Sequence, residues 1–210
     1  MAESSPVARS PISPAPPVTV EHGWEVSTHR TDADPRIMDC TPLAKILVLA
    51  TTDGEVARAL GVPFGRAARD KHGTLVVGSG PGEWLLLAPP GAGAEVAGRV
   101  EEMTDEGLVS VFDVTHGRAL MRLTGWRAAE LLAKVCGIDF SEQVTPDSAA
   151  FRSSVAKLVT DVVRDDRDGE RAYLLHCERS SGQYLFDALL DAGDEFGVEI
   201  EGFVAPKHEE

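Results

Sequence analysis

One histidine stands where a general acid or base could act. His116 lies between Thr115 and Gly117, with Asp113 and Arg118 close by in the sequence. On a turn, a carboxylate can orient an imidazole so that the ring exchanges a proton with a substrate. A turn histidine that bonds only to its neighbours is the commoner arrangement, and the sequence favours it. We therefore keep His116 and Arg118 as candidates for a cleft or an interface.

A second group of polar residues accompanies the apolar segment 155–164, whose alternation predicts a single strand. In such a strand Lys157 and Asp161 share one face and lie roughly 13 Å apart at about 3.3 Å per residue, so each needs a partner from a neighbouring strand. A carboxylate at Asp161 can contact a cationic or N–H-bearing ligand, although a solvated or interface-facing strand is the simpler interpretation. Three further residues fit either the lining of such a cleft or a contact with another subunit: Arg152, Arg179 and Tyr184.

The other chemistry-bearing residues lack the spacing of a catalytic or metal site. The glycines of 78–82 precede a strand-like segment instead of a helix, so they predict a tight hairpin and not a phosphate loop. Ser180 and Ser181 fall at an expected helix start, where hydroxyls cap free N–H groups. The histidines show no paired metal spacing, so we expect no metal ligand. The sequence also shows no nucleophile arrangement, so we expect no catalytic residue. An odd number of cysteines without C-x-x-C spacing predicts buried thiols in a reducing compartment: Cys40, Cys136 and Cys177.

Strands and helices follow one another in mixed order. Short runs rich in Val, Ile and Leu predict strands at 45–50, 74–78, 84–88, 108–114, 118–123, 155–164 and 171–177. Asp168-Gly169 predicts a hairpin turn before the last of these. Helices are expected at 55–60, 92–103, 125–136 and 182–192, and Thr124 and Ser181 are expected to cap the last two. This order predicts an α+β fold with a mixed, largely antiparallel sheet and packed helices.

Composition excludes several classes of partner. The 210 residues carry 34 acidic and 20 basic side chains, a formal charge of −14. A surface this negative repels phosphate backbones, so nucleic acid is not an expected partner. No apolar run approaches the ~20 residues that cross a bilayer, and residues 1–17 lack the apolar segment of a signal peptide. We expect a cytoplasmic protein with no membrane partner.

The chain is expected to have one folded unit between two tails. Residues 1–19 are rich in Pro and Ser and predict an extended arm, and 205–210 form a short charged tail. Ile12 and Val18 are isolated apolar residues in the arm, a pattern compatible with docking onto a partner and equally with a solvated leader. Between the tails lies a single α+β domain, 20–204. Its halves share a hairpin, strand and helix order, which suggests two related subdomains, 20–105 and 106–204.

Five segments in order carry a family resemblance. They are ARSPISPAPP (8–17), GSGPGEWLLLAP (78–89), DVTHGRALMRLTG (113–125), AFRSSVAKLVTDVV (150–163) and YLLHCERSSGQYLFDALLDAG (173–193). Together they resemble the gamma subunits of heterotetrameric sarcosine oxidases, over most of the chain. The resemblance implies a fold similar to the folate-binding aminomethyltransferases.

The same resemblance implies a role. Heterotetrameric sarcosine oxidases demethylate sarcosine to glycine, pass the one-carbon unit to tetrahydrofolate and form hydrogen peroxide. The resemblance implies FAD, FMN, NAD and tetrahydrofolate on other subunits, no cofactor on this chain, and alpha, beta and delta subunits as partners. The segment 158–163 is similar to the region where aminomethyltransferases carry an acidic pair that handles the folate-bound substrate. Here Thr160 precedes Asp161, so that pair is broken.

Two hypotheses follow from these residues. The first is a small accessory, non-catalytic subunit of a sarcosine oxidase complex. The alternative is a free-standing folate-binding protein or aminomethyltransferase-like enzyme, with Asp161, Arg152, Arg179 and Tyr184 around a cleft.

Overall fold

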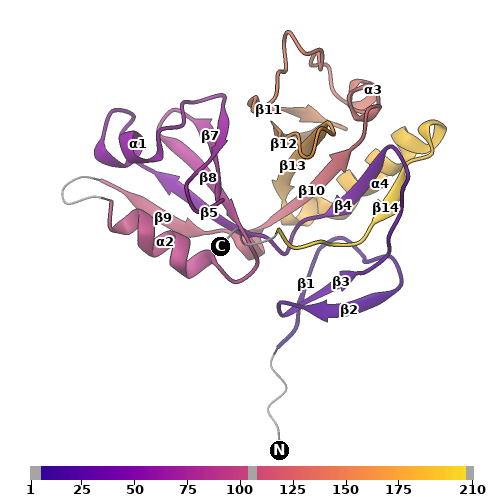
Figure 1. The fold of residues 1–210 in the computed structure, drawn as a ribbon, viewed down its shortest axis with the longest axis horizontal. Helices are drawn as coiled ribbons and strands as arrows, with labels where there is room; N and C mark the ends of the chain where they lie inside the picture. The colour runs from indigo at the N-terminus through magenta and orange to yellow at the C-terminus, as the bar shows by residue number, and fades with distance from the viewer. Residues whose placement is uncertain (1–5, 104–107, 207–210) are drawn as a thin grey trace, which may run out of the picture.

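Two main β-sheets face each other, and each carries helices on its outer side (Figure 1). The computed structural model describes residues 6–103 and 108–206. The predicted α+β class, with largely antiparallel pairing and packed helices, is confirmed. Among these described residues, no helix is long and apolar enough to cross a membrane.

The larger sheet has six strands in the order β11-β12-β13-β10-β4-β14. All neighbours pair antiparallel except β14 with β4, which are parallel. Its central strands β10 and β13 are the most deeply buried, since helices cover one face and the second sheet covers the other. The strands are β4 (Arg36–Asp39), β10 (Arg118–Thr124), β11 (Ala150–Val155), β12 (Leu158–Arg164), β13 (Ala172–Glu178) and β14 (Glu199–Glu201).

The second sheet has five antiparallel strands in the order β6-β7-β8-β5-β9. The predicted hairpin at Ser79–Gly82 joins β7 to β8, with a register shift between Gly78 and Gly80. Neither sheet is confined to one half of the sequence, because β4 pairs with β10 and β9 pairs with β5. The strands are β5 (Ala44–Leu49), β6 (Ala67–Arg69), β7 (Leu75–Gly80), β8 (Glu83–Ala88) and β9 (Ser110–Asp113).

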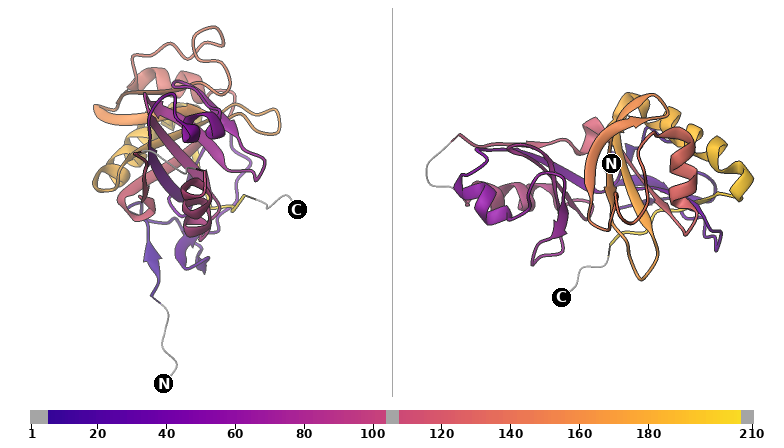
Figure 2. Two further views of the ribbon diagram at one scale, coloured as in Figure 1. Left: turned by 90° about the vertical axis from the view of Figure 1, so that its left-hand side faces the viewer. Right: turned by 90° about the horizontal axis from the view of Figure 1, so that it is seen from above.

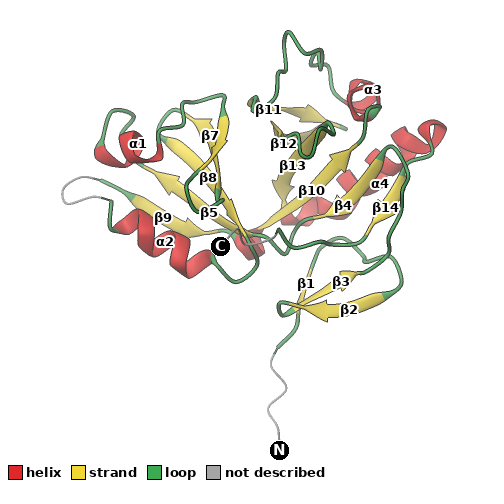
Figure 3. Cartoon of the chain, in the orientation of Figure 1, coloured by secondary structure: helices red, strands yellow, loops and turns green. Residues whose placement is uncertain are grey.

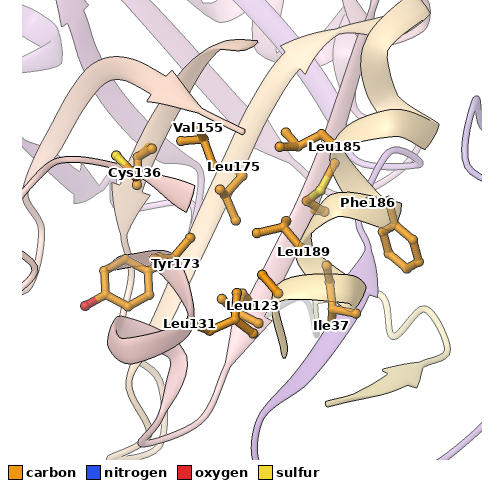
Figure 4. Close-up of a cluster of buried hydrophobic side chains, with 14 of the residues drawn as sticks. Ile37, Leu123, Leu131, Cys136, Val155, Tyr173, Leu175, Leu185, Phe186 and Leu189 are labelled. Carbon is orange, nitrogen blue, oxygen red and sulfur yellow. The ribbon is translucent and has the colours of Figure 1, made fainter. Parts of the chain in front are cut away.

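Helices complete the outer layers (Figure 3). The first two, α1 (Glu55–Leu60) and α2 (Gly93–Glu101), pack through Val56, Val96 and Val100 on the five-stranded sheet. The other two, α3 (Ala128–Val135) and α4 (Gly182–Gly193), cover the six-stranded sheet. Their leucines and Phe186 interlock with side chains of β4, β10 and β13 (Figure 4): Ile37, Leu123, Tyr173 and Leu175.

A third apolar layer lies between the sheets. Alternation along each strand sends Leu120 and Leu174 from one sheet, and Leu75, Leu85 and Leu87 from the other, into a shared cluster. We call this cluster the inter-sheet core. The molecule therefore has four layers, helices, sheet, sheet and helices, and two cavities open at opposite ends of the inter-sheet core.

The N-terminal segment packs on its own domain. Strand β1 (Ala8–Arg9) pairs with β3 (Trp24–Ser27), which also pairs with β2 (Val18–Glu21). Ile12 is 1% exposed and belongs to the core beneath α4, so neither alternative for this residue, docking onto a partner or a solvated leader, is right. A Cβ at Gly182 would lie 2.8 Å from Pro11 Cγ, which shows how closely the arm approaches the helix. Strands β1, β2 and β3 lie below the six-stranded sheet in the view of Figure 1, and Figure 2 gives two further views.

The expected single strand 155–164 is a hairpin. Strand β11 ends at Val155, which pairs with Leu158 at the start of β12. The two residues between them, Ala156 and Lys157, have φ of 47° and 68°. Left-handed φ at both central positions is the geometry of a tight two-residue hairpin turn, which Gly or Asn normally signals. Lys157 is therefore in the turn and does not share a strand face with Asp161.

Both expected helix caps are wrong in detail. Thr124 ends β10, and α3 begins later, after Arg127, with no side-chain cap bond. Ser181 does occupy the N-cap of α4, but its side chain makes no cap hydrogen bond, because the chain enters the helix through a 3₁₀ turn at Arg179–Ser181. The helices nevertheless lie within about three residues of their expected bounds, 125–136 and 182–192.

Candidate functional site

A cavity of about 310 Å³ opens at one end of the inter-sheet core. We call it the Asp161 cavity. Its apolar wall comes from Leu47, Leu85, Val114 and Val159, and its polar wall from Ser79, Glu83, Arg118, Arg152, Asp161, His176 and Glu178. Both sheets contribute, so the cavity exists only when the two halves of the fold are assembled.

Strand register places the charged residues together. Arg152 of β11 lies opposite Asp161 of β12, which lies opposite His176 of β13. Residues directly opposite in neighbouring strands have side chains on the same face within contact distance. The three side chains therefore form one row across the six-stranded sheet, facing the second sheet.

The Asp161 carboxylate is occupied by its neighbours. Arg152 Nε donates to Asp161 Oδ1 at 2.6 Å, and His176 Nδ1 lies 3.2 Å from Asp161 Oδ2. Burial opposes ionisation, but the hydrogen bonds and charges of these two partners outweigh it and lower the pKa of Asp161. Arg152 also reaches across the inter-sheet space, with Nη2 3.1 Å from Glu83 Oε1. The row thus links the two sheets by ion pairs.

His176 is neutral and holds one unsatisfied nitrogen. Burial lowers its pKa, opposed by the hydrogen bond to Asp161. A carboxylate only accepts hydrogen bonds, so Nδ1 carries the proton and Nε2 carries the lone pair. Within the described part of the chain, Nε2 is buried and has no hydrogen-bond partner. The side chain is 6% exposed, so the orphaned acceptor costs about 1–3 kcal/mol unless a ligand group donates to it.

Three of the residues singled out in the sequence line this cavity, and four do not. Arg118, Arg152 and Asp161 line it, with Arg118 paired to Glu178 at the rim. The other four are placed elsewhere in the fold: His116, Lys157, Arg179 and Tyr184. A cleft built from Asp161 and Arg152 together with Arg179 and Tyr184 is therefore wrong.

Three of those residues make local contacts, and Lys157 lies in the turn between β11 and β12. The His116 ring stacks on Trp24 with 4.8 Å between centroids and 10° between planes. Arg179 Nη2 donates to the backbone oxygen of Arg9 at 2.5 Å, which ties the N-terminal segment to the start of α4. Tyr184 is 55% exposed, and its hydroxyl is 3.4 Å from the backbone oxygen of Ala156. Packing and tethering account for them without chemistry.

Sequence reasoning missed two members of the hydrogen-bonded network around Asp161. They are His176 and Glu83, and both lie in segments that predict apolar strands. A signal existed for His176, because antiparallel pairing of adjacent strands places it opposite Asp161 once the hairpin turn at Asp168-Gly169 is fixed. Glu83 belongs to the other sheet, and no local pattern reveals a contact between sheets.

The Asp161 carboxylate is better placed to hold the sheets together than to transfer a proton. A general base must accept a substrate proton, and Asp161 already accepts from Arg152 and His176. Residues 6–103 and 108–206 hold no group of three or more His, Cys, Asp or Glu side chains placed to bind a metal ion. All three cysteines are free and buried, and burial raises the pKa of Cys40 and Cys177 to about 11.

Comparison with known proteins defines the family. Residues 72–208 match the family model described as the GCVT N-terminal domain, and the chain belongs to that family. The matched region includes β7 to β14 and every described residue of the polar wall of the Asp161 cavity.

The predicted resemblance to sarcosine oxidase gamma subunits is confirmed. The chain is 28% identical over 144 residues to the sarcosine oxidase subunit gamma of Corynebacterium sp. strain P-1, covering 69% of this chain and 68% of that one. It spans only 33% of an aminomethyltransferase from Geobacillus thermodenitrificans, to which it is 31% identical over 59% of its own length. Two further curated relatives are matched over 15% and 20% of their length.

Solved structures agree on the fold. A chain of the heterotetrameric sarcosine oxidase from Corynebacterium sp. U-96 superposes with a TM-score of 0.67 at 23% identity, covering 76% of this chain and 84% of that one. The aminomethyltransferase T from Bartonella henselae gives 0.70 at 18% identity, covering 88% and 55%. The expected aminomethyltransferase-like fold is thereby confirmed.

Proposed function

We propose that this chain is the small gamma-type accessory subunit of a heterotetrameric sarcosine oxidase. The observation that carries the proposal is the similarity to a sarcosine oxidase subunit gamma, which extends over about two thirds of both chains. The other curated relatives are much longer than this chain, as expected if they combine this unit with further catalytic domains. An accessory subunit needs a stable fold for assembly and does not need catalytic residues of its own.

The site supports a non-catalytic role. Asp161 is saturated by Arg152 and His176, and Thr160 stands where an aminomethyltransferase is expected to carry its other acidic residue. Thr160 is buried, and its hydroxyl donates to the backbone oxygen of Leu158. The strand segment is therefore built for packing, and the ion pairs stabilise the contact between sheets.

The proposal includes the rest of the complex. Alpha, beta and delta subunits would bind this chain in the cytoplasm and carry FAD, FMN, NAD and tetrahydrofolate. Together they would demethylate sarcosine to glycine, transfer the one-carbon unit to tetrahydrofolate and form hydrogen peroxide. The 1–19 arm, the 20–105 and 106–204 subdomains and the 205–210 tail remain our proposed division of this chain.

Co-expression tests the proposal. The tagged full chain is co-expressed with candidate alpha, beta and delta subunits from the same organism, purified by the tag and scanned for flavin absorbance. We expect a flavin-containing complex that oxidises sarcosine, and loss of the assembled complex when this chain is omitted. Recovery of this chain free of flavoprotein, together with full oxidase activity of the other subunits without it, would overturn the proposal.

One observation favours the alternative, a folate-binding protein. The Asp161 cavity has an orphaned acceptor at His176 Nε2, which a ligand N–H group could satisfy. Calorimetric titration of the isolated chain with tetrahydrofolate separates the two functions. Heat at micromolar ligand that disappears in Asp161→Asn would support folate binding, and no heat would dismiss it.

A further inference from the structure

A second cavity, of about 510 Å³, opens at the other end of the inter-sheet core. We call it the Arg167 cavity. It is separated from the Asp161 cavity by side chains of the inter-sheet core, including Leu120 and Leu85. Its lining combines arginines with aliphatic side chains, and the arginines are Arg69, Arg122 and Arg167.

The three guanidinium groups share one carboxylate. Arg69 Nη2 lies 2.8 Å from Asp165 Oδ1, while Arg122 Nη2 lies 2.7 Å and Arg167 Nε 3.1 Å from Asp165 Oδ2. The Asp165 side chain is 10% exposed, so it lies beneath the arginines. Among the described residues of the cavity lining, Asp168 is the one acidic side chain. In a protein with a formal charge of −14, this end of the inter-sheet core concentrates positive charge.

Arg167 is the guanidinium with the most donors to spare. Arg122 also donates to the backbone oxygen of Asp165, and Arg69 donates to that of Gly73. Among the described residues, Arg167 bonds through Nε alone, which leaves both Nη groups without a protein acceptor. Burial, followed by repulsion from Arg122, lowers the pKa of Arg167. The two free Nη groups form a fork of hydrogen-bond donors, which can bind an oxyanion through two hydrogen bonds at once.

The rest of the lining is apolar. Leu43, Leu75, Leu87 and Leu174 form the floor, and Pro89 lies at the edge. A volume of this size lies within the roughly 300–1,000 Å³ typical of small-molecule sites, which pair an apolar wall with a few placed polar groups. The leucine floor would bury the body of a ligand while the arginines bind its charged end.

We propose that the Arg167 cavity binds a small organic anion, with a carboxylate or phosphate group on the Arg167 fork and an apolar body over the leucine floor. The site is distinct from the Asp161 cavity, whose lining carries three carboxylates against two guanidinium groups. The inference goes beyond the accessory role and is tested on the isolated full chain.

Three phenyl probes test the proposal. Benzoate and phenyl phosphate share an aromatic body and differ in the anionic group, and benzamide has the same body without charge. We expect calorimetry to show binding of one or both anions, weakening as salt rises, and none of benzamide. The stronger anion identifies the preferred group. Absence of binding by both anions would overturn the proposal.

Two arginine variants localise the binding. Arg167→Gln should weaken anion binding about ten-fold or more, because a charge-assisted pair is lost. The matched control, Arg58→Gln, removes an exposed arginine of α1 and should leave the affinity unchanged. Equal affinity of wild type and Arg167→Gln would overturn the proposal.

A chemical measurement on the wild-type chain covers the case in which the variant fails to fold. Phenylglyoxal modifies accessible arginines, and peptide mapping reports each site. We expect the bound anion to slow modification of Arg167 several-fold and to leave Arg58 unchanged. Equal protection of both residues, or of neither, would contradict the site.

Discussion

The two cavities at the ends of the inter-sheet core balance charge in opposite ways. In the Asp161 cavity, Arg152 is shared between Asp161 and Glu83, so carboxylates outnumber guanidinium groups. In the Arg167 cavity, three arginines converge on Asp165. One apolar layer thus separates a cavity with an excess of carboxylates from a cavity with an excess of guanidinium groups.

The difference separates contacts that stabilise the fold from polar groups that remain free to bind a ligand. Removing a carboxylate that three cations share should lower the free energy of unfolding strongly, because each partly buried cation then loses its counter-charge. Removing a carboxylate that is paired with one half-exposed arginine and one neutral histidine should lower the free energy of unfolding less. The four predictions below are ordered by the size of the effect that this contrast implies.

The largest effect is expected for Asp165→Asn. Removing the shared charge should lower the free energy of unfolding by about 3 kcal/mol, the lower end of the range for a broken buried ion pair. The value lies at that end because Arg69 and Arg167 are more than a third exposed, so solvent screens their interaction with Asp165. Urea denaturation measures it. Asp168→Asn, an exposed change in the same hairpin, should alter stability by less than about 0.5 kcal/mol. Similar losses for the two variants would contradict the claim that the carboxylate shared by three arginines stabilises the fold.

Asp161→Asn should have a smaller effect, about 1–2 kcal/mol. Arg152 is 48% exposed and keeps Glu83, and the new amide oxygen still accepts from His176. The same urea titration compares it with Asp53→Asn, an exposed control before α1. A loss greater than that of Asp165→Asn would reverse the contrast between the cavities.

His176 should give the protein an acid-sensitive step. Its pKa is lowered in the fold, so below about pH 6.5 the unfolded chain binds a proton that the folded chain does not, and the free energy of unfolding falls as pH falls. Asp161 does not contribute in this window, since its lowered pKa matters only below its unfolded value near pH 4. Between about pH 7 and pH 5 the wild type should therefore lose more stability than His176→Asn, which keeps the donor to Asp161. Parallel pH profiles of the two proteins would show that the fold does not lower the pKa of His176.

The smallest effect is expected at the rim of the Asp161 cavity. The ion pair between Arg118 and Glu178 is exposed, with side-chain exposures of 32% and 65%. Glu178→Gln should cost less than about 1 kcal/mol at low salt and nothing measurable at high salt. Thermal unfolding at two salt concentrations measures it. A larger or salt-independent loss would mean that the rim pair is part of the buried row.

Local signals in the sequence identified much of the fold. Helix α1 has the predicted bounds, Glu55–Leu60, and the hairpin at Asp168-Gly169 forms where its turn residues indicated, with φ of 54° and 80°. The turn at Ala156-Lys157 adopts the same left-handed geometry without such residues. Pairing of β11 with β12 imposes that turn, so no local pattern could reveal it.

The candidate site was predictable only in part, for the same reason. Arg152 and Asp161 lie in neighbouring strands, and cross-strand pairing brings them together. Glu83 reaches the site from the other sheet, and Asp165 meets Arg69 across about a hundred residues of sequence. These contacts depend on how two sheets stack, and that arrangement follows from the apolar layer between them and not from any residue near the charge.

The most direct test of the accessory-subunit assignment is sedimentation of the co-expressed proteins, followed at a flavin wavelength and at the wavelength of a fluorophore attached to this chain. We predict that both signals move together as one species larger than either component, and that flavin sediments as a smaller species when this chain is left out. Independent movement of the two signals at every protein concentration would contradict the assignment.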